Sequence, residues 1–141
     1  MPRNPTSESV ENYLEAILML QSEDKVVRVK NISRRVDVSM PSVHTALHVL
    51  EDRGYIRHEK YGYVELTREG EAMAKRIYAS HLLITEFLTR VLGVPQEIAQ
   101  HDACKIEHIV SGETLDRMAD FTKRFIGTED ARQRNHGPDP A

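Results

Sequence analysis

The chain has 141 residues, and 19 Lys and Arg stand against 22 Asp and Glu, for a formal net charge of -3. Hydrophobic residues at 40% and charged residues at 29% are ordinary proportions for a globular protein, which excludes a disordered or fibrous chain. No stretch approaches the roughly 20 apolar residues that span a bilayer, and the first residues lack the apolar region of a signal peptide. We therefore expect a cytoplasmic protein of one compact unit or two small ones.

Charge is distributed unevenly along the chain. Residues 1–24 hold one basic and five acidic residues, a net charge of -4, whereas residues 25–76 hold eleven and seven, a net charge of +4. Residues 77–141 hold seven and ten, a net charge of -3. A basic block between two acidic ones is typical of a DNA-binding module, although chance could also produce an asymmetry of this size.

The first predicted element is an amphipathic helix over residues 7–22, where apolar residues recur with the helical period. A short extended segment follows, and then a short helix over residues 29–35. The next stretch predicts a turn at Asp37, a helix with Ser39 as its N-cap, and a helix end at Gly54.

Residues 55–59 and 62–66 alternate polar residues with β-branched and aromatic ones around Gly62, which predicts a two-stranded hairpin. Helix, turn, helix and hairpin in this order are typical of a winged helix, and we expect a DNA-binding domain over residues 1–70. In a winged helix the second helix of the turn motif enters the major groove.

We expect the first turn of that second helix to contact base edges, and the surrounding cations to contact phosphates. The base-edge candidates are Ser39, Pro41, Ser42, His44 and Thr45. The phosphate candidates are Arg28, Lys30, Arg34, Arg35, Arg53, Arg57 and Lys60. None of the base-edge candidates forms a bidentate arginine–guanine pair, so phosphate contacts and DNA shape should supply much of the affinity. The alternative is a winged helix that binds another protein.

The C-terminal half predicts three helices, over residues 67–92, 95–110 and 111–126. We expect a helical metal-binding and dimerisation domain over residues 71–126 and a disordered tail over residues 127–141. The apolar residues of these helices exceed what three short helices bury among themselves. A homodimer interface would cover the excess.

A cluster of potential metal ligands lies in the second of these helices. Cys104, Glu107 and His108 stand at i, i+3 and i+4, which places a thiol, a carboxylate and an imidazole on one helix face. A transition metal needs donors from further elements. The candidates are Asn12, Glu15 and His81. A cysteine at such a position can also be a core residue or a nucleophile. We expect no enzyme, because the chain shows no glycine-rich oxyanion or phosphate loop and the basic module would be unexplained.

Five segments, in order, resemble the diphtheria-toxin-repressor family of metal-dependent transcription regulators. The segments are SVENYLEAILML, SMPSVHTALHVLEDRGYI, ELTREGE, SHLLITEFL and DACKIEHIVSGET, within residues 9–122. The resemblance implies a winged helix followed by a helical dimerisation domain, in a homodimer that binds a pseudo-palindromic double-stranded DNA operator. It also implies a repressor of metal-homeostasis genes, with Fe(II) or Mn(II) as co-repressor.

The same resemblance implies metal ligands at Glu15, His81, Cys104, Glu107 and His108. Asn12 stands where the family has a Met or Asp ligand, so its neutral amide would be a weaker donor. Thr85 and Gln100 stand where iron-sensing members have a carboxylate and a histidine at an ancillary site, which looks degraded here.

Iron and manganese both remain open on these residues. The sequence ends without the SH3-like domain of longer family members, as in the short manganese-sensing regulators. The Cys104 thiolate instead favours Fe(II), because soft sulfur suits Mn(II) poorly. A regulator that responds to a small ligand or to oxidation of Cys104 is a further alternative.

Our mechanistic hypothesis is that metal links the first helix to the dimerisation domain. Without metal, Glu15, Glu107 and the Cys104 thiolate would repel one another or stay partly protonated. Fixing the first helix would then set the two recognition helices of a dimer at about 34–36 Å or a multiple of it, the spacing of half-sites on one face of DNA.

Overall fold

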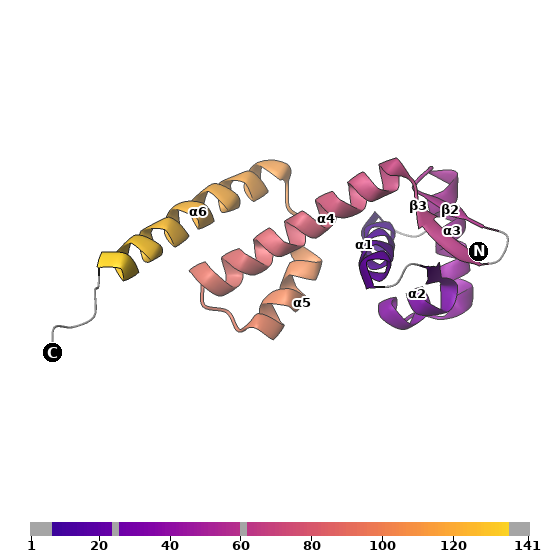
Figure 1. Ribbon diagram of the computed structural model, residues 1–141, viewed down its shortest axis with the longest axis horizontal. Helices are drawn as coiled ribbons and strands as arrows, with labels where there is room; N and C mark the ends of the chain where they lie inside the picture. Colours follow the sequence, from indigo (N-terminus) through magenta and orange to yellow (C-terminus); the bar gives the residue numbers. More distant parts are fainter. Residues whose placement is uncertain (1–6, 24–25, 60–61, 136–141) are drawn as a thin grey trace. The chain divides into compact units, whose positions relative to one another are not determined.

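The structure is a computed structural model that describes residues 7–23, 26–59 and 62–135 (Figure 1). The chain is mainly helical with one small antiparallel sheet, which confirms the predicted fold class. It divides into two compact units, Met1–Tyr78 and Ala79–Ala141. Within the described ranges, no helix combines the length and the apolar character that a bilayer span requires.

The N-terminal unit is a winged helix. Its elements are α1 (Ser7–Glu23), β1 (Val27–Arg28), α2 (Val29–Val36), α3 (Met40–Asp52), β2 (Ile56–His58), β3 (Tyr63–Leu66) and the first part of α4 (Arg68–Glu86). The sheet is three-stranded, in the order β1-β3-β2, rather than the two-stranded hairpin we predicted. The additional strand β1 pairs Val27 with Val64, and both side chains are buried, so this pairing closes the core.

The turn between α2 and α3 has the predicted chemistry. Asp37 adopts a left-handed backbone with a φ of 59°. The Ser39 side chain accepts a hydrogen bond of 3.3 Å from the backbone N–H of Ser42, which satisfies one of the free donors at the start of α3. Pro41 occupies the first turn, where its missing N–H has no intrahelical acceptor to lose.

A continuous apolar core joins the three helices of the winged helix to its sheet. Its fully buried side chains are Leu14, Ile17, Val27, Ile32, Val43, Leu47, Leu50, Ile56 and Val64. Because each such side chain contributes about 1.5–3 kcal/mol through burial, the core fixes the position of α3 against the wing. The opposite face of α3 stays exposed.

A close backbone approach links the wing to α4. A Cβ atom added at Gly70 would lie 1.9 Å from the carbonyl oxygen of Tyr55, so only glycine fits there. The Thr67 hydroxyl donates to the Gly54 carbonyl at 2.6 Å and accepts from the Gly70 N–H at 3.1 Å. These contacts start α4 at the position that the sequence predicted.

The C-terminal unit contains the end of α4, the π-helical turn η1 (Phe87–Val91), α5 (Gln96–Ile106) and α6 (Gly112–Asn135). The predicted uninterrupted α-helix to residue 92 is wrong in detail, because the helix changes to the wider π-helical form after Glu86. In η1 the N–H of Leu92 donates to the carbonyl of Phe87 at 3.3 Å, five residues back. The hydroxyls of Thr85 and Thr89 also donate to carbonyls four residues back.

Two further helix ends differ from the prediction. Helix α5 ends at Ile106 instead of residue 110, because the N–H of Ile109 bonds back only three residues, to Ile106. Helix α6 continues through residues 127–135, which we had expected to be disordered; apart from one glycine this stretch is rich in good helix formers, and it ends with arginines that suit a helix C-terminus. Residues 136–141 of the expected tail lie outside the described ranges.

Candidate metal centre and DNA-binding surface

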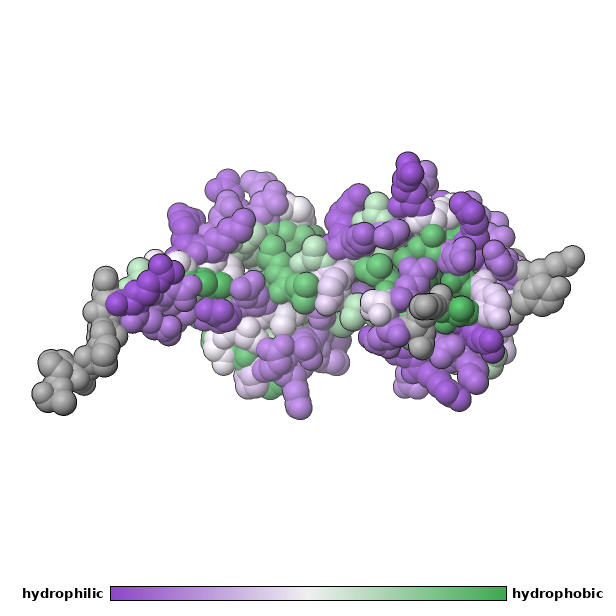
Figure 2. All heavy atoms as spheres, in the orientation of Figure 1, coloured by the Kyte–Doolittle hydropathy of each residue, from purple (hydrophilic) through white to green (hydrophobic). Residues whose placement is uncertain are grey.

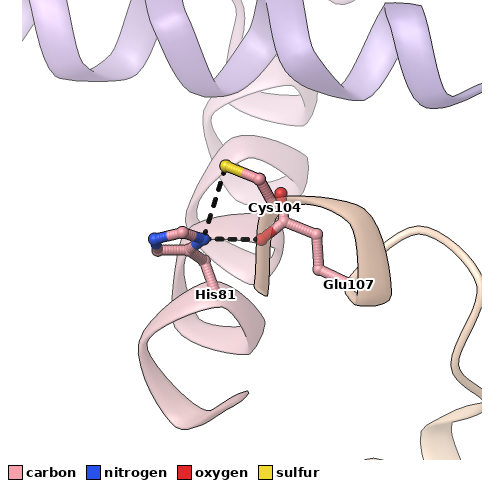
Figure 3. Close-up of side chains that lie close together, drawn as sticks. All are labelled: His81, Cys104 and Glu107. Atoms are coloured by element: carbon pink, nitrogen blue, oxygen red, sulfur yellow. Dashed lines mark hydrogen bonds and ion pairs between the residues drawn. The ribbon is translucent and has the colours of Figure 1, made fainter. Parts of the chain in front are cut away.

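Three potential metal ligands converge in the C-terminal unit (Figure 3). His81 projects from α4 and Cys104 from α5, and Glu107 is the C-cap residue of α5. The Nδ1 atom of His81 lies 3.0 Å from Oε2 of Glu107 and 3.8 Å from Sγ of Cys104. All three donor atoms lie within 4.8 Å of one another, and no other such group of His, Cys, Asp and Glu occurs in the described part of the chain.

The cluster has a closed side and an open side. The Glu107 side chain is fully buried, and its second oxygen lies 3.4 Å from Nε2 of His108, whose side chain is 2% exposed. His81 is 13% exposed, and Cys104 is exposed. A buried carboxylate needs polar partners. His81 lies within hydrogen-bond distance of Oε2, whereas the contact of His108 with Oε1 is longer.

This donor set fits a divalent transition metal. One metal with bonds of about 2.0–2.3 Å brings neighbouring donor atoms to roughly 3–4 Å from each other, which the two observed contacts of His81 match. Sulfur, nitrogen and oxygen donors together suit Fe(II), Co(II), Ni(II) or Zn(II), and the carboxylate also suits Mn(II). Of the predicted ligands, the structure thus brings together His81, Cys104 and Glu107, with His108 against the carboxylate.

The other two predicted ligands lie on α1 in the N-terminal unit. Asn12 and Glu15 are both half-buried and stand three residues apart, which places them on one face of the helix. Their role at the metal stays a prediction that rests on the family resemblance.

The predicted DNA-contacting side chains form an exposed surface at the start of α3. Ser39, Pro41, Ser42, His44 and Thr45 are all exposed. The Ser39 hydroxyl donates to that of Ser42 at 2.9 Å, and the Thr45 hydroxyl donates to the Pro41 carbonyl at 3.1 Å. These hydroxyls partly satisfy one another, so a base contact would require them to exchange partners.

The predicted phosphate-binding cations differ in their surroundings. Lys30 and Arg34 are exposed on α2, whereas Arg35 forms a 2.8 Å ion pair with Glu23 of α1. Lys60 lies outside the described residues. Arg28 stacks over the ring of Tyr63, with its guanidinium carbon 5.3 Å from the ring centroid. We had not singled out Tyr63, and the pairing of β1 with β3 that places it opposite Arg28 is invisible in the local pattern.

Several large apolar side chains of the C-terminal unit are exposed. They are Leu82, Leu92, Ile98, Ile109 and Phe121, each at least 48% exposed. Figure 2 shows apolar surface on the visible face of this unit. Surface of this kind marks an interface.

A winged helix followed by a helical unit with a cluster of metal-ligand side chains defines a class of protein: a DNA-binding regulator under metal control. The comparison with family models agrees over nearly the whole chain. Residues 5–64 match the N-terminal DNA-binding domain of iron-dependent repressors, and residues 67–130 match their metal-binding and dimerisation domain. The chain belongs to the iron-dependent repressor family, which is the diphtheria-toxin-repressor family of regulators.

Individual matches include a relative of similar length and longer proteins of known structure. The transcriptional regulator MntR of Bacillus subtilis is 35% identical over 92% of this chain and 90% of its own length. Among solved structures, IdeR of T. acidophilum matches with a TM-score of 0.72 and 27% identity over 84% of this chain. The manganese regulator SloR matches with a TM-score of 0.74 and 27% identity over 86%. This chain covers 54% and 55% of those two structures, so it spans about half their length.

Proposed function

We propose that this chain is a metal-activated transcriptional repressor whose C-terminal cluster senses Fe(II) or Mn(II) and whose winged helix binds operator DNA. The observation that carries the proposal is the convergence of His81, Cys104 and Glu107 inside the segment that matches the family's metal-binding domain. Family members are regulators and not enzymes. We further propose that the chain acts in the cytoplasm, as a homodimer on double-stranded DNA with two-fold related half-sites.

The proposed ligands have distinct roles. His81 presents Nδ1, Cys104 its thiolate, Glu107 a carboxylate oxygen and His108 its imidazole, which lies 3.4 Å from the other oxygen of Glu107. When bound, a divalent ion would supply the positive charge that balances the thiolate and the carboxylate. Glu15, and more weakly Asn12, are proposed as further donors from α1.

In this proposal α1 transmits the signal. The core of the winged helix contains Leu14 and Ile17 of α1 together with Val43 and Leu47 of α3, so restraining α1 also restrains the recognition helix. A helix held by Glu15 would give the two recognition helices of a dimer one spacing instead of many. By linkage, operator DNA would tighten metal binding by the same factor as metal tightens DNA binding.

The residues leave the choice of metal open between iron and manganese. Replacing the soft Cys104 thiolate by a carboxylate should move the preference toward manganese. We therefore expect Cys104→Asp to raise the ratio of Mn(II) to Fe(II) affinity. An unchanged ratio would show that Cys104 does not set selectivity.

The deciding experiment titrates metals into the full-length protein and measures its affinity for a DNA duplex selected from a random pool with the metal-loaded protein. Fe(II), Mn(II), Co(II) and Zn(II) are compared under anaerobic conditions. We expect tight binding only with metal. Metal-independent binding would overturn the proposal in favour of a regulator that responds to a small ligand or to oxidation, which the family match does not favour.

Two variants separate the sensing cluster from α1. Cys104→Ser should abolish the thiolate-to-cobalt charge-transfer absorption of the Co(II) protein, whereas the exposed Glu113→Gln on α6 serves as the matched control and should retain it. Glu15→Ala should lose metal-dependent DNA binding but keep its fold and dimer. Unchanged activation by metal in Glu15→Ala would refute the role of α1.

A further inference from the structure

Two histidines meet at the junction of the recognition helix and the wing. The ring centroids of His44 on α3 and His58 on β2 lie 6.1 Å apart, and the ring planes are inclined by 29°. His44 is exposed in the first turns of α3, and His58 is half-buried. The metal-sensing cluster involves neither residue. We propose that His44 and His58 form a proton-dependent contact with a DNA phosphate, which makes operator affinity rise as pH falls.

The position of His58 follows from the strand. Along β2, Ile56 is buried, Arg57 is exposed and His58 is half-buried, so Ile56 and His58 share one face. Ile56 belongs to the core that also contains Leu47 and Leu50 of α3. His58 therefore lies at the outer end of the face that packs on α3, next to the helix surface that we expect to meet DNA.

The charged groups on the elements around this pair are of both signs. On α3 the titratable group one turn from His44 is His48, which is exposed. On the wing, Val64 of β3 pairs with His58, while Arg57 pairs with Glu65 on the other face of the sheet and Glu59 follows His58 along the chain. The other elements that pack on α3 meet it through the shared core. Their charged residues are Lys30, Arg34 and Arg35 on α2 and Glu8, Glu11, Glu15 and Glu23 on α1.

The chemistry of two neighbouring imidazoles explains a dependence on protons. Neutral rings can lie side by side, but two imidazolium cations at this distance repel each other in the free protein. A phosphate oxygen placed against both N–H groups removes that repulsion and accepts charge-assisted hydrogen bonds. DNA binding is then coupled to proton uptake, because the anion favours the protonated pair.

The inference rests on the proposed DNA-binding function, and the experiment distinguishes the two. Affinity of the metal-saturated dimer for the selected duplex is measured at about pH 6 and about pH 8, either side of the range in which histidine changes charge. We expect the wild-type protein to bind about tenfold more tightly at the lower pH, as for one charge-assisted hydrogen bond. The slope of log affinity against log salt should steepen by about 0.9 for each additional phosphate neutralised.

Variants show whether the pair is responsible. His58→Gln should remove most of the pH effect, and His58→Lys should bind tightly at both pH values. His101→Gln removes an exposed histidine from α5 in the other unit and should behave as the wild type, which controls for the loss of a histidine elsewhere in the chain.

Several outcomes would overturn the inference. A wild-type pH ratio in His58→Gln would show that another group titrates, and an equal loss of affinity at both pH values would show that His58 is only structural. Metal-dependent binding with the same affinity at both pH values would overturn this inference alone. Absence of any metal-dependent DNA binding would overturn the proposed function as well.

Discussion

Replacing Glu107 by glutamine tests the metal centre without creating a cavity at a buried side chain. The carboxylate has no exposed surface and lies 3.0 Å from His81 Nδ1 and 3.4 Å from His108 Nε2. Glutamine has almost the same shape, and its amide can still donate to one imidazole and accept from the other. We therefore expect the metal-free variant to unfold with a free energy within about 1 kcal/mol of the wild type.

The metal-linked part of the stability should change much more. A ligand at 100 times its Kd stabilises the folded state by about 2.7 kcal/mol. If loss of the anionic oxygen weakens metal binding by about 100-fold, the same metal concentration stabilises the variant by only about 0.4 kcal/mol. At about 4 °C per kcal/mol, the metal-induced rise in Tm should fall from about 11 °C to about 2 °C.

The assay is thermal unfolding with and without Mn(II), and with Fe(II) under anaerobic conditions. Glu113→Gln provides the control, since it makes the same chemical change at an exposed side chain of α6 whose ion pair with Arg117 is 3.7 Å long. A metal-induced shift in Glu107→Gln equal to that of the control would refute the assignment of Glu107 as a ligand.

Three further predictions concern the winged helix. Gly70→Ala should lower the unfolding free energy by about 1–3 kcal/mol in urea titrations, because its Cβ would lie 1.9 Å from the Tyr55 oxygen; an unchanged midpoint would contradict this close approach. Burial raises the pKa of Tyr13 above its ordinary 10.0, so its contribution to stability is complete below that value and is lost as pH rises through the raised pKa. Tyr13→Phe should therefore lose less stability than the wild type between neutral and strongly alkaline pH, measured by denaturant unfolding, and equal losses would disprove it. Arg34→Gln should lower the slope of log affinity against log salt by about 1 if its exposed side chain contacts a phosphate.

The winged helix was largely predictable because its boundaries are local. The N-cap of α3 at Ser39 and its termination at Gly54 depend on residues close by in the sequence, and both occur where expected. The extended segment at β1 was predicted, but its place in the sheet was not, because Val27 pairs with Val64, far along the chain. A strand of two residues is also too short to show the alternation of polar and apolar side chains by which strands are predicted.

The candidate site was predictable in its residue types but not in its geometry. Spacing put Cys104 and Glu107 on one face, yet α5 ends at Ile106, so Glu107 reaches the cluster from the helix cap. The contact of His81 with both depends on how α4 and α5 pack, which spacing within one helix does not encode. In the same way, no local pattern shows that Arg35 pairs with Glu23.

The asymmetric burial of the cluster bears on why it suits a sensor. Structural metal sites are closed by four protein ligands, whereas sites that exchange their metal or bind a further group keep a position open. Here Glu107 and His108 are shielded from solvent, while Cys104 is exposed. These residues would hold a divalent ion with its accessible side at Cys104, where a further side chain or water could join them. Because the affinity of such a site depends on that additional donor, metal occupancy can respond to the rest of the chain, as a metal-activated repressor requires.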